Sequence, residues 1–299
     1  MFSGGLDSTA YAVDRASKLD NHGRAVFVAY NRPLKDIPNQ VFRDIKHLTR
    51  EVGGQADLEQ IGLTPLSHGR GWDTSNRSRS LLYIATALCV AVNHRVNRVA
   101  IPENGQLAIN PALTPARHGA CSTRSAHPWI LYLINKLIDG LGGHVTVENP
   151  YLELTKGQVC KVALDIARQA DLGYEALERT VSCGHPTTVR PTYSHCGYCF
   201  PCLVRRSGLH FAFAGHPDGT RYAVELSDID LTNPRNPRAV HLRDLCFWLG
   251  TEFSGDDLLA DAPLPADINL DTVKHVVDAG RRELKTMLSD LVPETRAIR

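Results

Sequence analysis

The stretch that decides the fold opens the chain and reads Phe2-Ser3-Gly4-Gly5-Leu6-Asp7-Ser8-Thr9. Two adjacent glycines allow a tight turn and let the backbone come close to a ligand. The pattern from Thr9 to Lys18 is helical, so the turn is expected to lead into a helix N-terminus. The N–H groups and the dipole at a helix N-terminus favour anions. The stretch therefore predicts a phosphate-binding loop, and a helix-capping surface turn is the alternative.

This loop is neither the Walker pattern, which ends in Gly-Lys-Ser/Thr, nor the GxGxxG dinucleotide fingerprint. It resembles the SGGxDS motif of the PP-loop ATP pyrophosphatases, an α/β class of the HUP type that converts ATP to AMP and pyrophosphate. For this chain we assign the ATP site to the loop and to the end of the next expected strand: Ser3, Gly4, Gly5, Leu6, Asp7, Ser8 and Tyr30. A phosphate loop in an α/β sheet should follow a buried strand. Because only Met1 and Phe2 precede it, we expect a true start upstream, with a shortened central strand as the alternative.

The composition is that of an ordinary globular protein. The 299 residues are 43% hydrophobic and 22% charged, close to the average for such proteins. No apolar run reaches the 18 or so residues of a membrane span and no signal-peptide pattern is present, so we expect a cytoplasmic protein without membrane contact. Lys plus Arg (33) nearly balances Asp plus Glu (32), which gives no strong signal for nucleic-acid binding.

Strands and helices alternate downstream of the loop. Short apolar runs predict strands at residues 25–30, 56–63, 98–101 and 144–149. Helices are expected at residues 38–52, 80–93, 129–141 and 155–170. This order predicts an α/β protein with a Rossmann-like, doubly wound parallel sheet.

A long irregular stretch runs from Pro102 to Pro128, after the strand at residues 98–101. Such loops inside a compact domain are usually functional or disordered, and ligands of open α/β sheets bind at the carboxyl ends of strands. We therefore expect a substrate loop here, in which the candidate binding residues are Glu103, Asn104, Thr123 and Arg124.

Two cations, Arg79 and Lys156, stand at expected helix N-termini. A positive charge there opposes the helix dipole, so a bound phosphate or substrate carboxylate would explain each of them. A side chain that reaches into solvent is the alternative for both, and pairing with Asp73 is a further one for Arg79. Thr155 and Gln158 have the spacing of a capping box around Lys156.

Four of the eight cysteines, Cys183, Cys196, Cys199 and Cys202, follow the spacing C-x12-C-x2-C-x2-C. Four thiolates in this pattern match a closed tetrahedral Zn²⁺ site. An iron–sulfur cluster is the rival. With four protein ligands the metal has no open position, so its expected role is structural. Cys89 and Cys160 are expected in the core and Cys121 in the substrate loop.

The loop at Ser3 and the segment from Ser182 to Leu209 together resemble the QueC family of 7-cyano-7-deazaguanine (preQ0) synthases, and the likeness spans residues 3–213. The resemblance implies adenylation of 7-carboxy-7-deazaguanine by ATP, followed by displacement of AMP by ammonia and conversion of the amide to a nitrile with a second ATP. It places Arg79 and Lys156 at positions where the family has an arginine and a lysine. We assign catalysis to Asp7, Lys156 and Arg79, with Asp7 as a Mg²⁺ or water ligand and Lys156 stabilising the departing pyrophosphate.

The chain departs from this family in two respects. The family's acidic substrate segment is absent, and residues 103–128 instead resemble the QueC-like, QatC-type proteins of anti-phage defence islands. The chain also continues beyond the likeness. We expect a QueC-like domain at residues 1–214, which includes the zinc segment 183–202, and a helical extension at residues 215–299 with helices at 239–249 and 271–291. The apolar stripe of the last helix is a packing face or, alternatively, a surface for a partner protein: Val273, Val276, Val277, Leu284, Leu288 and Leu291.

The expected function is therefore an ATP-dependent ligase that adenylates a 7-deazaguanine carboxylate and passes it to an amine. The defence-type resemblance implies that the amine belongs to a partner protein, and plain preQ0 synthesis is the conservative alternative. tRNA thiolation and an inactive nucleotide-binding scaffold are further alternatives. The balanced charge and the single closed cysteine set argue against thiolation. A homodimer is a further expectation.

Overall fold

The computed structural model describes residues 1–19, 23–30, 42–43, 55–62, 79–115, 124–169, 173–185 and 194–292, without the side chains of Arg79 and Gln169. Several sequence predictions lie outside these residues: Thr123, Cys121 and nearly all of the helix expected at 38–52.

The strands form two parallel pairs. β1 (Arg24–Tyr30) pairs with β2 (Gln55–Ile61), and β3 (Arg98–Ala100) pairs with β4 (Thr146–Glu148). Met1 and Phe2 lie between the pairs, because Phe2 N donates to the Val28 carbonyl (2.8 Å) and the Met1 amino group donates to the Ala100 carbonyl. The two residues before the glycine loop thus link β1 to β3.

Helices cover both faces of the strands. Successive residues of β1 point into different hydrophobic clusters, as the twofold period of a strand requires: Val28 packs with Ile84 of α3 (Arg79–Asn93), whereas Phe27 packs with Val13 of α1 (Leu6–Ser17). α5 (Pro128–Gly140) joins the α3 cluster through Leu131. The chain is therefore a mixed α/β protein with parallel strands, as predicted.

The remaining helices continue the chain to its end: α4 (Gly105–Ile109), α6 (Lys156–Gln169), α7 (Glu175–Glu178), α8 (Phe200–Phe213), the 3-10 turn η3 (Leu226–Asp228), α9 (Ala239–Gly250), α10 (Gly255–Asp261) and α11 (Leu270–Leu291). α1 and α6 pack on each other through Leu6, Ala10, Val159 and Leu164. Across the described ranges, none of the helices combines the length and the apolar character needed to cross a membrane.

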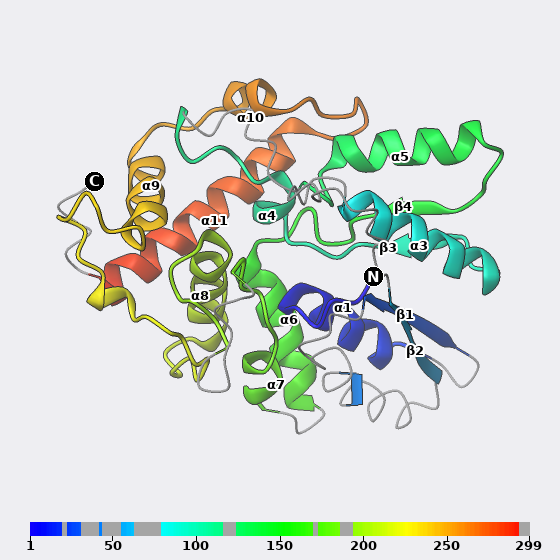
Figure 1. Ribbon diagram of the computed structural model, residues 1–299, viewed down its shortest axis with the longest axis horizontal. Coiled ribbons are helices and arrows are strands. Elements are labelled where there is room, and N and C mark those ends of the chain that lie inside the picture. Colours follow the sequence, from blue (N-terminus) through cyan, green and yellow to red (C-terminus); the bar gives the residue numbers. More distant parts are fainter. Residues whose placement is uncertain are drawn as a thin grey trace, which may run out of the picture.

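The C-terminal extension shares a core with α8. Leu203 of α8 packs with Leu245 of α9 and Leu284 of α11 in one cluster, and Figure 1 shows α11 running across α8 and past α4. The expected apolar stripe of α11 is buried inside the chain, except for Leu291, which is exposed. The division at residue 214 stays a prediction, but residues on both sides of it build one hydrophobic cluster.

The predicted element positions agree with the structure to within one or two residues for most strands and helices. Three differences have local causes. The stretch after Ile101 is not wholly irregular, because buried Asn104 caps the five-residue α4. The predicted helices do not include α7, α8 or α10, although Ser254 and Asp257 form a capping box at the start of α10. Cys89 was expected in the core and is exposed instead, because its face of α3 points away from β1 and β3, whereas Cys160 is buried as expected.

Candidate nucleotide-binding and catalytic site

The glycine loop adopts the tight turn that its sequence predicts. Gly4 has a φ of +72°, in the left-handed region that favours glycine. A Cβ at Gly5 would lie 3.1 Å from Ser3 Oγ and 3.3 Å from the Val181 carbonyl oxygen. Ser3 and Ser8 brace the turn from inside, since their hydroxyls lie 3.1 Å apart and Gly5 N donates to Ser3 Oγ (3.2 Å). The loop thus leads into α1, whose N-cap Gly5 offers no side-chain acceptor to the helix amides.

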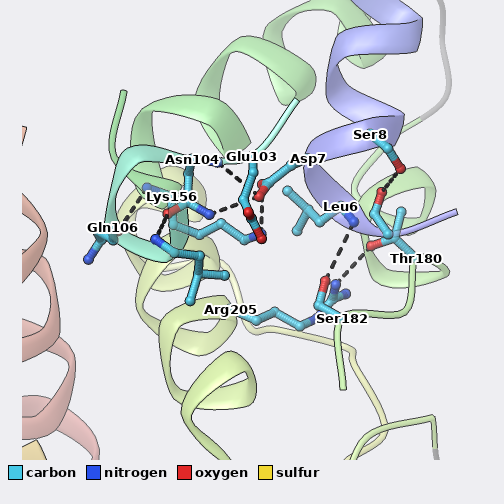
Figure 2. Close-up of polar contacts among 12 residues, drawn as sticks. Leu6, Asp7, Ser8, Glu103, Asn104, Gln106, Lys156, Thr180, Ser182 and Arg205 are labelled. Atoms are coloured by element: carbon cyan, nitrogen blue, oxygen red, sulfur yellow. Dashed lines mark hydrogen bonds and ion pairs between the residues drawn. The ribbon is translucent and has the colours of Figure 1, made fainter. Parts of the chain in front are cut away.

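A buried ion pair joins the loop to α6. Lys156 Nζ donates to Asp7 Oδ1 at 2.6 Å, and Lys156 is only 2% exposed. The other carboxylate oxygen, Asp7 Oδ2, accepts from Asn104 Nδ2 (2.8 Å) and Asn104 N (3.2 Å). Figure 2 shows Lys156 and Asp7 pointing toward each other with Asn104 alongside. The solvent-facing alternative for Lys156 is therefore wrong, because its charge is paired within the protein.

Glu103 adds a third ionisable group beside this pair. Desolvation, and to a smaller degree the Asp7 carboxylate, raise its pKa to about 7, while Lys156 acts in the opposite direction. Asn149 holds the Glu103 backbone from both sides, since it accepts from Glu103 N (3.1 Å) and donates to the Glu103 carbonyl (2.8 Å). A carboxyl group with a pKa near neutrality can exchange a proton during a reaction.

These groups line a cavity of about 540 Å³, within the usual size range of small-molecule sites. The glycine loop forms one wall with Ser3, Gly5, Leu6, Asp7 and Ser8. Glu103, Arg124 and Lys156 contribute the remaining charges, and the residues Pro111, Leu113, Phe200 and Pro201 give an apolar side. The cavity thus combines the glycine loop and its charged neighbours with an apolar wall.

Arg124 is held in the cavity wall by the C-terminal extension. Its guanidinium donates to the Asp261 carboxylate and, at 3.1 Å, to the Asp261 carbonyl. The same carboxylate accepts from the backbone N–H of Ala112 (3.2 Å), another cavity residue. Asp261 was not foreseen from sequence, because it stands 137 residues from Arg124 in the chain.

Other expected site residues are placed as follows. Asn104 is fully buried behind Asp7 and Gly4 turns the loop, and neither is among the residues that line the cavity. Tyr30 also lies off the cavity lining; its hydroxyl donates to the Tyr83 carbonyl (2.6 Å) and its ring stacks on Tyr83. Arg79 begins α3, and its side chain falls outside the described part of the chain, as does Thr123 altogether.

The four predicted cysteines converge. The sulfur atoms of Cys183, Cys196, Cys199 and Cys202 all lie within 4.8 Å of one another, and Cys196 and Cys202 are 3.8 Å apart. A tetrahedron of zinc–sulfur bonds of about 2.3 Å has edges of about 3.8 Å, so the set fits such a metal. Hydrogen bonding among the sulfurs lowers the pKa of Cys183 and raises that of Cys202. Four adjacent thiolates need a cation to hold them together, and the cluster could bind zinc.

Backbone amides surround the sulfur cluster. Cys196 N and His185 N donate to the Cys183 sulfur, and Gly184 N donates to the Cys199 sulfur, each at 3.3–3.4 Å. His195 is buried outside the sulfur cluster, where its Nε2 accepts from Ser182 N (3.0 Å). It is thus not one of the candidate metal ligands.

The cysteine centre is linked to the glycine loop. Val181 N donates to the Gly4 carbonyl (3.2 Å) and Leu6 N donates to Ser182 Oγ (3.5 Å), so the two residues before Cys183 lie directly under the loop. Buried Arg205 donates to Thr180 Oγ1 (2.8 Å) and to the Leu177 carbonyl (3.0 Å), which holds the same segment from α8 (Figure 2). Arg205 therefore supports the segment that leads into the cysteine cluster.

A comparison with curated proteins gives one significant similarity. Over 82 residues the chain is 34% identical to a 7-cyano-7-deazaguanine synthase of Paramagnetospirillum magneticum. The aligned part covers 27% of this chain and 31% of the relative, so the chain matches less than a third of the relative's length. No protein-family profile matches the chain.

Proposed function

We propose that the chain is an ATP-dependent carbon–nitrogen ligase that adenylates the carboxylate of 7-carboxy-7-deazaguanine and transfers the acyl group to an amine. The observation that carries the proposal is the buried Lys156–Asp7 pair, which lies beside the glycine loop in the wall of the cavity. The partial similarity to a 7-cyano-7-deazaguanine synthase supports it. The proposal includes a HUP-type, doubly wound sheet, which the link through Met1 and Phe2 supports.

The first half-reaction follows from the charges in the cavity. A carboxylate oxygen of the substrate attacks the α-phosphorus of ATP, the bond to the β-phosphate oxygen breaks, and pyrophosphate leaves with that electron pair. The loop amides and Lys156 stabilise the negative charge on the leaving group. Mg²⁺, when bound, would neutralise phosphate charge, and the carboxylates available to hold it are Asp7 and Glu103.

In the second half-reaction the amine nitrogen attacks the activated carbonyl carbon and AMP leaves, while the amine loses a proton. Glu103, whose pKa is about 7, is the group in the cavity wall suited to accept that proton. Arg124 and the apolar side of the cavity would hold the base. The zinc at the four cysteines would serve the loop structurally, through Val181 and Ser182.

For the amine we propose a partner protein of an anti-phage defence operon, which gives a nucleobase–protein conjugate. Ammonia, which gives preQ0, is the second candidate, and the name of the similar bacterial protein favours it. Incubation with ATP, 7-carboxy-7-deazaguanine and either ammonium or the products of neighbouring genes separates the two by mass spectrometry. Nitrile formation with ammonium alone at a rate comparable to AMP release would contradict the conjugation proposal.

A homodimer is part of the proposal, with the surface of α3 and α5 as its interface. Leu133 and Leu137 of α5 and Leu141 just after it recur every four residues and are 47%, 57% and 79% exposed; Leu81 and Val92 of α3 are 55% and 65% exposed. Exposed apolar side chains of this kind are what the buried centre of an interface needs. Light scattering should show a dimer, and Leu137→Glu should give monomers; a monomeric unmodified chain would contradict this part.

A further inference from the structure

The extension reaches the first turn of α6, the helix that Lys156 begins. Glu283 of α11 is buried there, and its two carboxylate oxygens accept from two neighbours of the lysine. One oxygen accepts from the Thr155 hydroxyl, and the other accepts from Gly157 N at 3.1 Å. Helix α11 thus holds the residues on either side of Lys156.

Every amide of this first turn has a side-chain acceptor. Lys156 N donates to Gln106 Oε1 (2.9 Å), Gly157 N donates to Glu283, and Gln158 N donates to Thr155 Oγ1 (3.1 Å). A carboxylate at this end of a helix also interacts favourably with the helix dipole. The backbone of Lys156 is therefore fixed, and its side chain extends from a fixed base toward Asp7.

Glycines allow the close approach that these contacts need. A Cβ at Gly157 would lie 2.6 Å from Glu283 Oε1, and a Cβ at Gly280 of α11 would lie 2.0 Å from Gln106 Nε2. A Cβ at Gly208 of α8 would lie 2.5 Å from Lys156 Cγ. Gly280 and Glu283 lie on one face of α11, because they are three residues apart. This face contacts the supports of Lys156, whereas Val277 and Leu284 face the apolar core.

A contribution to folding stability does not by itself explain the buried carboxylate of Glu283. Burial of a carboxyl group is costly without a paired cation, and no ion pair of Glu283 is found among the residues that the structure describes. Desolvation raises its pKa to about 7, against the smaller opposite effect of its two hydrogen bonds. Because burial of the Glu283 carboxyl group costs free energy, a role in the site explains this residue better than a role in packing.

We propose that Glu283 is a positioning residue of the reaction centre: through Thr155 and Gly157 it sets the first turn of α6 so that Lys156 Nζ stays at Asp7 in the cavity wall. The C-terminal extension is then an integral part of the site. The catalytic consequence rests on the proposed function, but the positioning of Lys156 does not.

The test compares Glu283→Ala and Glu283→Gln with Val277→Ala, a matched truncation in the core-facing stripe of the same helix. Mass spectrometry measures the rate at which an amine-reactive acylating reagent modifies Lys156 relative to the exposed Lys18. We expect acylation of Lys156 to rise about tenfold in Glu283→Ala through local opening and to stay near the unmodified level in Glu283→Gln and Val277→Ala. Glu283→Asp, whose side chain is one methylene shorter, gives the same comparison if the alanine variant does not fold.

ATP–pyrophosphate exchange with the deazaguanine substrate supplies the second measurement. Glu283→Ala should lower kcat by about 10- to 100-fold through misplacement of the lysine and leave the KM for ATP within about twofold, with recovery in Glu283→Gln. Unchanged acylation of Lys156 in Glu283→Ala would overturn the proposal, as would a fall in kcat that Val277→Ala reproduces. If the unmodified protein catalyses no exchange, the proposed function fails, and the acylation rate alone decides the positioning.

Discussion

Lys156 Nζ lies 2.6 Å from Asp7 Oδ1, although 149 residues separate the two in the chain. The contact joins the first turn of α1 to the first turn of α6, so two helix N-termini meet at one cavity. The lysine compensates the carboxylate inside the protein, and the pair lies next to the glycine loop.

The pair should be measurable in the unfolding free energy. Lys156→Met leaves a buried carboxylate without its cation and should cost about 3 kcal/mol, the lower part of the range for broken buried pairs. The double variant Asp7→Asn with Lys156→Met removes both charges and should recover part of the loss. Urea denaturation followed by circular dichroism measures both, and equal losses in the single and double variants would show that the pair is not coupled.

The contribution of Glu103 and Glu283 to stability should fall as the pH rises through neutrality. The pKa values of Glu103 and Glu283 are raised from 4.5 to about 7 in the folded protein, so the folded state holds protons that the unfolded state has lost. By linkage, their stabilising effect is present below pH 4.5 and lost as the pH passes 7. Two groups with lowered pKa values act in the opposite direction as the pH rises: His127 (about 4) up to its ordinary value of 6.5, and the Met1 amino group (about 5) up to its ordinary value of 8. The contribution of a glutamate between pH 6.5 and 8 is therefore measured as a difference between two variants.

The variant Glu283→Gln removes the titration of the Glu283 carboxyl group and so measures its contribution to stability. The variant should gain stability over the unmodified protein by an amount on the order of 1–3 kcal/mol at pH 8 and less at pH 6.5, since each pKa unit corresponds to about 1.4 kcal/mol. Melting temperatures across this window measure the difference. A difference that does not change with pH would mean that Glu283 does not titrate near neutrality.

Metal removal should act on nucleotide binding at a distance. Cys199→Ser removes one of four sulfur ligands and should release Val181 and Ser182, which lie under the glycine loop. We expect one zinc per unmodified chain by elemental analysis, and loss of both zinc and ATP binding in the variant. Cys89→Ser, at an exposed cysteine outside the cluster, is the control and should keep both. Full ATP affinity in a zinc-free variant would exclude the structural link.

The contact of Asp261 with Arg124 should control substrate affinity. Asp261→Asn removes the charge that holds Arg124 and weakens the contact to Ala112 N. We expect the KM for the carboxylate substrate to rise about tenfold, which corresponds to about 1.4 kcal/mol, while the dissociation constant of ATP stays unchanged. Asp256→Asn changes an exposed residue of the same helix and should behave like the unmodified protein. Equal effects of the two variants would assign Asp261 to folding alone.

Sequence patterns predicted the local features of this structure well. The glycine pair at Gly4 and Gly5, the capping box of Thr155 with Gln158 and the convergence of four cysteines depend on short spacings, and each is confirmed. The alternation of strand-like and helix-like hydrophobic patterns along the chain was sufficient to predict the parallel strands and the helices that cover them.

Contacts between residues that lie far apart in the chain could not be predicted from the sequence. Nothing in the neighbourhood of Lys156 indicates that its charge is paired with Asp7, because the pairing depends on how α1 and α6 pack on each other. Glu283 and Asp261 belong to a segment that reads as amphipathic helix, in which polar residues are ordinarily assigned to solvent. For Tyr30, the predicted position at the end of β1 is confirmed, but its side chain contacts Tyr83 and does not line the cavity.

The most direct test of the central claim is ATP–pyrophosphate exchange by the purified chain in the presence and absence of 7-carboxy-7-deazaguanine, with Lys156→Met beside it. The account predicts exchange that depends on this carboxylate and falls by at least about 100-fold in the variant, the size of effect expected when a group that stabilises transition-state charge is lost. Exchange that is indifferent to the deazaguanine carboxylate, or unchanged in Lys156→Met, would contradict it.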